Sequence, residues 1–197
     1  MKTPFRFQAS DYDCVPTTFI NAISYLFERS EIPPLVIQRI FTYCLDSISS
    51  QQNLGHGTTS YAVQLMGNFL SEFQEKGFKV CTEYICDERV HLGRNNKIAR
   101  TLNAGGAALL NVKSIGNDWH YVLALEIDAN WLYIFDPYPK KNYKKFGDKF
   151  VYVKQEFPQG PNLHVRREWL DSKNNSELNS LGPIKTREAL LLWRADA

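Results

Sequence analysis

Three residues that are far apart in the chain have the types needed for cysteine-dependent hydrolysis: Cys14, His120 and Asp136. A catalytic cysteine attacks as a thiolate, which is favoured by a helix amino terminus and a nearby protonated histidine. Cys14 stands where the first helical pattern begins, so its backbone N–H should be an unpaired donor that can bind an oxyanion. Gln8, six residues upstream, is the candidate for a second donor through its carboxamide.

His120 and Asp136 belong to two neighbouring strand patterns. Residues 119–127 and 131–135 are rich in aromatic and β-branched side chains, which favour strands. The residues between them, Asp128-Ala129-Asn130, are typical of a turn, and Asn130 tolerates the left-handed conformation that a three-residue loop requires. We therefore expect a β-hairpin.

The register of this hairpin decides whether the two side chains can meet. A three-residue loop would place Ile127 opposite Trp131 and Val122 opposite Asp136. His120 shares the face of Val122 because side chains alternate along a strand, so His120 and Asp136 become diagonal neighbours. A two-residue loop would instead place them on opposite faces of the hairpin.

Together these residues predict a nucleophile, a base and an orienting group. Cys14 would attack a carbonyl to form a thioester, His120 would transfer the proton, and Asp136 would hold the imidazole in the useful tautomer. Gln8 and the Cys14 amide would bind the oxyanion. The leading hypothesis is a peptidase or other amide hydrolase. The same triad would serve glutamine deamidation or acyl transfer, and a non-catalytic peptide-binding module is a further alternative.

These motifs resemble those of a known group of enzymes. Gln8 and Cys14, with Asp13 before the cysteine, are similar to the start of the bacteriocin-processing (double-glycine leader) peptidases and their stand-alone relatives within the papain-like cysteine peptidases. His120 in Trp-His-Tyr-Val-Leu and Asp136 in Phe-Asp-Pro-Tyr are similar to their histidine and aspartate motifs. The resemblance covers about residues 5–138 in order and spacing. It implies a papain-like fold with a helical half that carries the cysteine.

The chain also departs from this family. Members usually have glycine after the cysteine and a small residue soon after, whereas Val15-Pro16-Thr17 follows here. The wall beside the nucleophile therefore differs. Members fused to exporters carry membrane and nucleotide-binding domains, which this sequence does not include, so leader-peptide cleavage is not carried over.

Helical patterns dominate the first part of the chain. Apolar residues recur at helical spacing over residues 14–29, with Asp13 as the expected cap and Pro16 in the first turn. Further helices are expected at residues 35–45, from Thr58 or Thr59 to about residue 75 with Gly77 as the terminator, and at 94–103. Residues 47–57 are polar and should form a loop.

Strand patterns dominate the remainder. They are expected at residues 78–85, 107–112, 119–127, 131–135 and 150–153, with weaker candidates at 163–165 and 189–193. Helices followed by strands predict a segregated α+β fold with an antiparallel sheet. With the resemblance, this implies one papain-like domain over residues 1–197, in which residues 1–77 hold the nucleophile and residues 78–197 hold the histidine and aspartate.

Composition narrows the function classes. The 23 basic and 21 acidic side chains nearly balance, so no strong field favours nucleic acid or a membrane as a partner. The basic run at residues 140–145 is interpreted as a solvated loop. No apolar stretch is long enough to cross a bilayer and no signal sequence is visible, so the cytoplasm is the expected compartment. A peptide or protein is the expected partner; the oligomeric state is left open.

The four cysteines, Cys14, Cys44, Cys81 and Cys86, lack the spacing of a disulfide framework and are expected to be free thiols. Cys81 and Cys86 are five residues apart on one strand pattern, so they should face opposite sides and do not match a zinc pair. We expect neither a metal nor an organic cofactor.

Overall fold

The computed structural model describes residues 2–48, 55–73, 75–114, 118–138, 144–153, 157–174 and 177–195, with the backbone only at 144–146. Most of the polar loop predicted at 47–57 and most of the basic run at 140–145 lie outside these residues. In the described part, no helix has the length and apolar character needed to span a membrane.

Three helices form the first layer: α1 (Cys14–Leu26), α2 (Pro34–Tyr43) and α3 (Ser60–Glu72). All three were predicted, and the start of α1 at Cys14 is confirmed. The expected ends were too late. α1 stops at Leu26 because Phe27 has extended backbone, and α3 stops at Glu72, so Gly77 (φ +83°) lies in the following turn and does not terminate the helix.

Helix α1 is buried on almost all sides, which its predicted apolar stripe did not suggest. Its polar residues are accommodated by hydrogen bonds. The Thr18 hydroxyl lies 2.6 Å from the Cys14 carbonyl oxygen and 3.2 Å from that of Tyr121. Asn21 accepts from the Arg6 backbone N–H and donates to the Arg6 carbonyl, both at 2.9 Å. Buried polar groups are tolerated when they are paired in this way.

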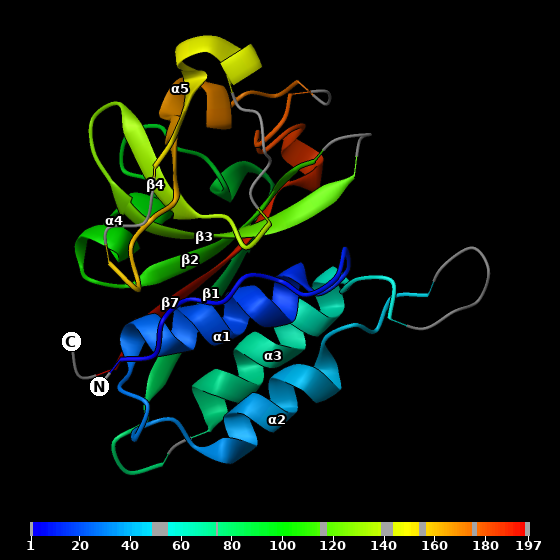
Figure 1. Cartoon of the computed structure of the whole chain (residues 1–197), viewed down its shortest axis with the longest axis vertical. Coiled ribbons are helices and arrows are strands. Elements are labelled where there is room, and N and C mark those ends of the chain that lie inside the picture. Colours follow the sequence, from blue (N-terminus) through cyan, green and yellow to red (C-terminus); the bar gives the residue numbers. More distant parts are fainter. Residues whose placement is uncertain are drawn as a thin grey trace.

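The second layer is an antiparallel seven-stranded sheet in the order β1-β7-β2-β3-β4-β6-β5 (Figure 1). The strands are β1 (Val80–Cys86), β2 (Ala107–Lys113), β3 (Trp119–Ile127), β4 (Trp131–Phe135), β5 (Phe150–Tyr152), β6 (Leu163–Arg166) and β7 (Glu188–Arg194). Each strand candidate corresponds to one of them. The α+β class is therefore confirmed.

Shorter helical elements surround the sheet. They are η1 (Asp87–Arg89), α4 (Lys97–Asn103), η3 (Lys144–Lys149), α5 (Arg167–Leu170) and η4 (Ile184–Thr186). The helix expected at 94–103 begins later, at Lys97, because Asn96 caps it by accepting from the Ala99 backbone N–H.

Alternate side chains of the sheet enter two hydrophobic cores. Helices α1, α2 and α3 cover one face, where Leu123 and Leu190 join the first core. Helices α4 and α5 lie on the other side, where Val122 and Leu191 join the second (Figure 1). The sheet is therefore buried on both faces, and α1 lies directly against its central strands.

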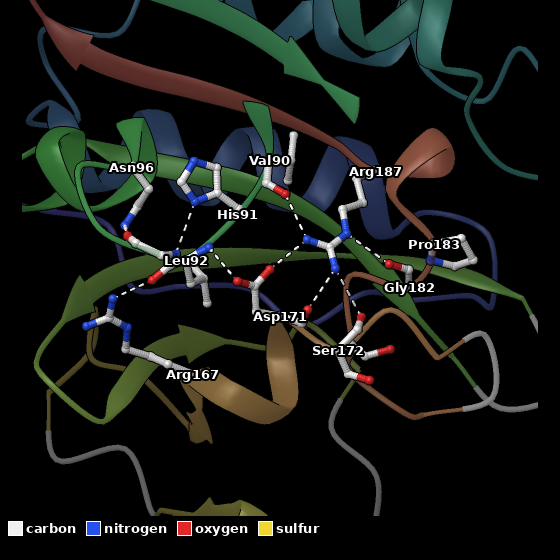
Figure 2. Close-up of polar contacts among 12 residues, drawn as sticks. Val90, His91, Leu92, Asn96, Arg167, Asp171, Ser172, Gly182, Pro183 and Arg187 are labelled. Carbon is white, nitrogen blue, oxygen red and sulfur yellow. Dashed lines mark hydrogen bonds and ion pairs between the residues drawn. The ribbon is translucent and has the colours of Figure 1, made fainter. Parts of the chain in front are cut away.

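A buried arginine ties the start of β7 to the segments that follow η1 and α5. The guanidinium of Arg187 donates to the carbonyls of Gly182, Val90, Asp171 and Ser172 and to the Asp171 carboxylate at 2.6–3.2 Å (Figure 2). Its backbone carbonyl accepts from the Asp87 N–H at 2.9 Å. The residue that follows, Glu188, therefore begins β7 at a rigidly held point.

Candidate active site

Cys14 is the first residue of α1 and is half-buried. Within the described chain, no acceptor takes its backbone N–H, as expected for the first turn of a helix. The amide is thus free for a ligand. The helix amino terminus also directs its partial positive charge at the sulfur.

Asp13 precedes the helix but does not cap it with its side chain, so the predicted capping role is wrong. Its carboxylate instead accepts from the Ala9 N–H at 2.9 Å and from the Ser10 N–H and hydroxyl at 2.8 and 2.7 Å. Burial raises the pKa of Asp13, but these hydrogen bonds outweigh burial and hold the pKa below its ordinary value. Asp13 therefore shapes the loop that leads into Cys14.

The β3–β4 hairpin does not have the predicted turn. Ile127 pairs with Leu132 and not with Trp131. The Asp128 N–H donates to the Trp131 carbonyl at 3.0 Å, and the Asp128 side chain accepts from the Trp131 N–H at 2.7 Å. Only Ala129 and Asn130 lie between these two residues, so the turn has the register of a two-residue loop and not of the predicted three-residue loop. The register then shifts between Ala124 and Glu126, leaving Leu125 as a bulge.

The bulge restores the register expected at the site. Beyond it Leu123 pairs with Phe135, and continuing this register past the end of β4 places Asp136 opposite Val122. Without the bulge, Asp136 would face Leu123 and would lie on the opposite side of the hairpin from His120.

His120 and Asp136 are in direct contact. Nε2 of His120 donates to Oδ1 of Asp136 at 2.7 Å, and both side chains are almost fully buried. Cys14 lies close enough to His120 to contribute to the raised pKa of the ring. Because Nε2 is engaged with the carboxylate, Nδ1 is the ring nitrogen available to exchange a proton with the thiol.

The surroundings favour the protonated imidazole. Burial lowers the pKa of His120, but the hydrogen bonds with Asp136 and Cys14 and their charges outweigh burial and raise the pKa to about 9. At neutral pH the proton therefore rests on the ring, where it is ready for transfer to a leaving group.

Asp136 is held from the backbone side by a residue that sequence reasoning missed. Asn162 is buried, accepts from the Asp136 N–H at 2.8 Å and donates to the Asp136 carbonyl at 2.9 Å. The Tyr138 N–H donates to the same Oδ1 that receives His120, at 2.8 Å. No local pattern marks Asn162 in the sequence, since the pairing depends on a loop 26 residues away.

Gln8 lies beside these residues through its backbone. Its N–H donates to the carbonyl of Pro137, the residue after Asp136, at 3.0 Å. One hydrogen of its carboxamide donates to the Ser10 carbonyl at 2.6 Å, while its Oε1 is buried without a partner in the described chain. The other amide hydrogen is not engaged there. The structure therefore brings Gln8 next to Asp136, and its predicted role as an oxyanion donor stays a prediction.

Cys14 opens onto a cleft of about 1270 Å³ between α1, α3 and one end of the sheet. Its wall includes Gln64 of α3, Tyr84 of β1, Trp119 of β3 and Glu188 of β7. A cleft of this size beside a nucleophile is large enough for several residues of an extended peptide.

The other cysteines lack this environment. All four thiols are free in the structure. Cys44 is buried, and burial raises its pKa to about 12. Cys86 lines the same cleft as Cys14, and Cys81 lies on β1. Among the described residues, no group of three or more histidine, cysteine, aspartate or glutamate side chains is suited to hold a metal.

A scan of protein-family models finds no match to this chain, and a search of curated proteins finds none either. The resemblance to the papain-like peptidases, noted on the motifs around Cys14, His120 and Asp136, therefore stays a prediction.

Proposed function

We propose that this chain is a cysteine-nucleophile hydrolase of papain-like architecture that cleaves amide bonds in peptides or proteins. The observation that carries the proposal is the grouping of Cys14 with His120, which is hydrogen-bonded to Asp136 at 2.7 Å. Cys14 lies at the amino terminus of α1 and on the wall of a large cleft. A nucleophile, a base and an orienting carboxylate in this order are what acyl transfer requires.

The proposed reaction has two stages. The Cys14 sulfur attacks the carbonyl carbon, and the oxyanion is bound by the Cys14 N–H and the Gln8 carboxamide. The C–N bond then breaks as the proton on Nδ1 of His120 passes to the leaving amine, and a thioester remains. Water next attacks the thioester and gives one proton to His120, and the C–S bond breaks to release the carboxylic acid and restore the Cys14 thiolate beside the protonated imidazole.

The test is incubation of the purified protein with unfolded protein substrates, followed by mass spectrometry of the products. Backbone hydrolysis creates new termini and adds the mass of one water across each pair of products. Deamidation or acyl transfer would leave the backbone intact and change only side-chain masses, which would replace the proposed hydrolysis by one of those reactions.

The variant Cys14→Ala should abolish hydrolysis, whereas Cys86→Ala is the matched control because Cys86 lines the same cleft. A chloroacetamide probe should label Cys14 in preference to Cys44, whose pKa of about 12 suppresses its reactivity. Absence of any product, together with labelling of Cys14 no faster than that of Cys86, would reject the proposal in favour of a binding module.

A further inference from the structure

One carboxylate on the cleft wall accepts hydrogen bonds from side chains of three other strands. The half-buried Glu188 of β7 accepts from the Asn111 carboxamide of β2 at 2.7 Å and from the Tyr121 hydroxyl of β3 at 2.5 Å through Oε1. Its Oε2 accepts from the Tyr84 hydroxyl of β1 at 2.5 Å. Glu188, Asn111, Tyr84 and Tyr121, which we term the Glu188 cluster, all line the cleft onto which Cys14 opens.

The charge of this cluster is not balanced by the protein. Its three donors are neutral, and burial together with Glu188 raises the pKa of both tyrosines, so they remain protonated. Within the described chain, no lysine, arginine or histidine forms an ion pair with Glu188. The adjacent Arg187 is fully used by Asp171 and four carbonyls (Figure 2). A partly buried carboxylate without a counter-ion is costly unless a ligand supplies one.

A second acceptor in the cluster also lacks a partner. Because a carboxylate only accepts, Asn111 must present its Nδ2 to Glu188, which turns Oδ1 away. This oxygen is buried without a donor in the described chain, and Asn111 is 6% exposed. Leaving a buried acceptor unpaired costs about 1–3 kcal/mol.

The cluster and the reacting sulfur share one cleft. Cys14, Tyr121 and Glu188 all line it, and the Tyr121 hydroxyl donates to Glu188. A substrate whose carbonyl is at Cys14 would therefore carry a neighbouring side chain to the cluster.

We propose that the Glu188 cluster is the subsite that binds the cationic side chain of a lysine or arginine in the peptide substrate. Ammonium and guanidinium groups are donors only and carry the charge opposite to that of Glu188, so they would balance it. This inference rests on the proposed function, since it names the substrate class of the same site.

The experiment measures peptide binding in the Cys14→Ala variant, so that turnover is not needed. The probes are acetyl-Ala-Ala-Xaa-Ala-Ala-amide peptides in which Xaa is lysine, arginine, norleucine or glutamate, titrated by calorimetry at low salt. We expect lysine and arginine peptides to bind about tenfold or more tightly than the norleucine peptide, and the glutamate peptide to bind most weakly. Equal affinities, including no measurable binding of any peptide, would overturn the inference.

Two variants in the same background locate the effect. Glu188→Gln should remove the preference because it keeps the shape and removes the charge. Glu83→Gln should keep the preference, since Glu83 lines the cleft but is already paired with Lys97. If the preference for cationic peptides survives Glu188→Gln, a group other than Glu188 causes it, and the inference is rejected. If Glu188→Gln does not fold, the affinities of the Cys14→Ala variant for the lysine and norleucine peptides still test the inference.

Failure of this inference is distinguishable from failure of the proposed function. Hydrolysis by the wild-type protein without any preference for lysine or arginine peptides would retain the function and reject the subsite. A cationic preference in binding, without hydrolysis by the wild-type protein, would retain the subsite and reject the hydrolase.

Discussion

Nε2 of His120 lies 2.7 Å from Oδ1 of Asp136, and the bulge at Leu125 determines that the two side chains leave the same face of the β3–β4 hairpin. The Asp136 carboxylate also accepts from the Tyr138 N–H. The Asn162 side chain hydrogen-bonds both the N–H and the carbonyl of Asp136. The imidazole is therefore held by a group that is itself fixed. This rigidity underlies the following predictions for the proposed hydrolase.

Replacing Asp136 with asparagine should reduce turnover severely while the fold survives. The amide oxygen can still accept from Tyr138, but the negative charge that offsets the burial of His120 is lost, so the pKa of His120 should fall. We expect kcat to drop by a factor on the order of 10³–10⁴. Steady-state kinetics and thermal unfolding check this together. A parallel loss of activity and thermal stability would mark Asp136 as a structural residue.

The His120–Asp136 pair should make stability depend on pH. The pKa of His120 is about 9 in the folded protein against an ordinary value of 6.5, so folding favours the protonated ring. This contribution is fully present below pH 6.5 and is lost as pH rises through 9, with an upper limit of about 3 kcal/mol.

Denaturant unfolding across this pH range is the measurement, and His120→Gln is its control, because glutamine can donate to Asp136 without titrating. The stability of the wild type should decline between pH 6.5 and 9 more steeply than that of His120→Gln. Parallel profiles would show that His120 does not titrate with a raised pKa.

Gln8 should contribute to the transition state and little to ground-state binding. Replacing it with alanine removes the proposed carboxamide donor but keeps the backbone bond to Pro137. We expect kcat to fall about 10²- to 10³-fold with KM nearly unchanged. The variant Gln8→Glu introduces a carboxylate of similar size that cannot donate, so it should lose as much activity as the alanine variant. Full activity of Gln8→Glu would exclude the oxyanion role.

Asn162 should act as a positioning residue for Asp136. Removing its side chain in Asn162→Ala removes two buried hydrogen bonds to the Asp136 backbone, which should cost about 1–3 kcal/mol for each bond. We also expect kcat to fall about ten- to a hundredfold with KM little changed, because the carboxylate is displaced from His120. Reduced stability with unaltered kcat would restrict Asn162 to a structural role.

Arg187 should be required for folding and not for chemistry. Arg187→Met removes the five hydrogen bonds of a buried guanidinium and leaves Asp171 without its cation, so the free energy of unfolding should fall by about 3–5 kcal/mol. Arg187→Lys should lose less, since it keeps the charge.

Arg166 provides the comparison, because it is 40% exposed and lies 3.9 Å from the exposed Asp148. Arg166→Met should cost less than about 1 kcal/mol in denaturant unfolding. Similar losses for Arg187→Met and Arg166→Met would contradict the anchoring role.

The sequence by itself determined most of the local structure. Periodic apolar residues and turn formers predicted every major helix and strand, because burial of one face and backbone propensity act over a few residues. The start of α1 at Cys14 and the extents of β3 and β4 follow directly from these patterns. The pairing of His120 with Asp136 was also predicted, although its predicted turn was wrong.

Only the tertiary structure decided how distant groups complete the site. The turn between β3 and β4 shifts the strand register by one residue, and the bulge at Leu125 shifts it back. This compensation depends on pairing along both strands, which no local pattern encodes. Asn162 reaches Asp136, and Glu188 collects donors from β1, β2 and β3, through contacts between residues far apart in the chain. Hydrogen bonds of this kind depend on sheet order and loop placement, which the packing of the whole chain sets.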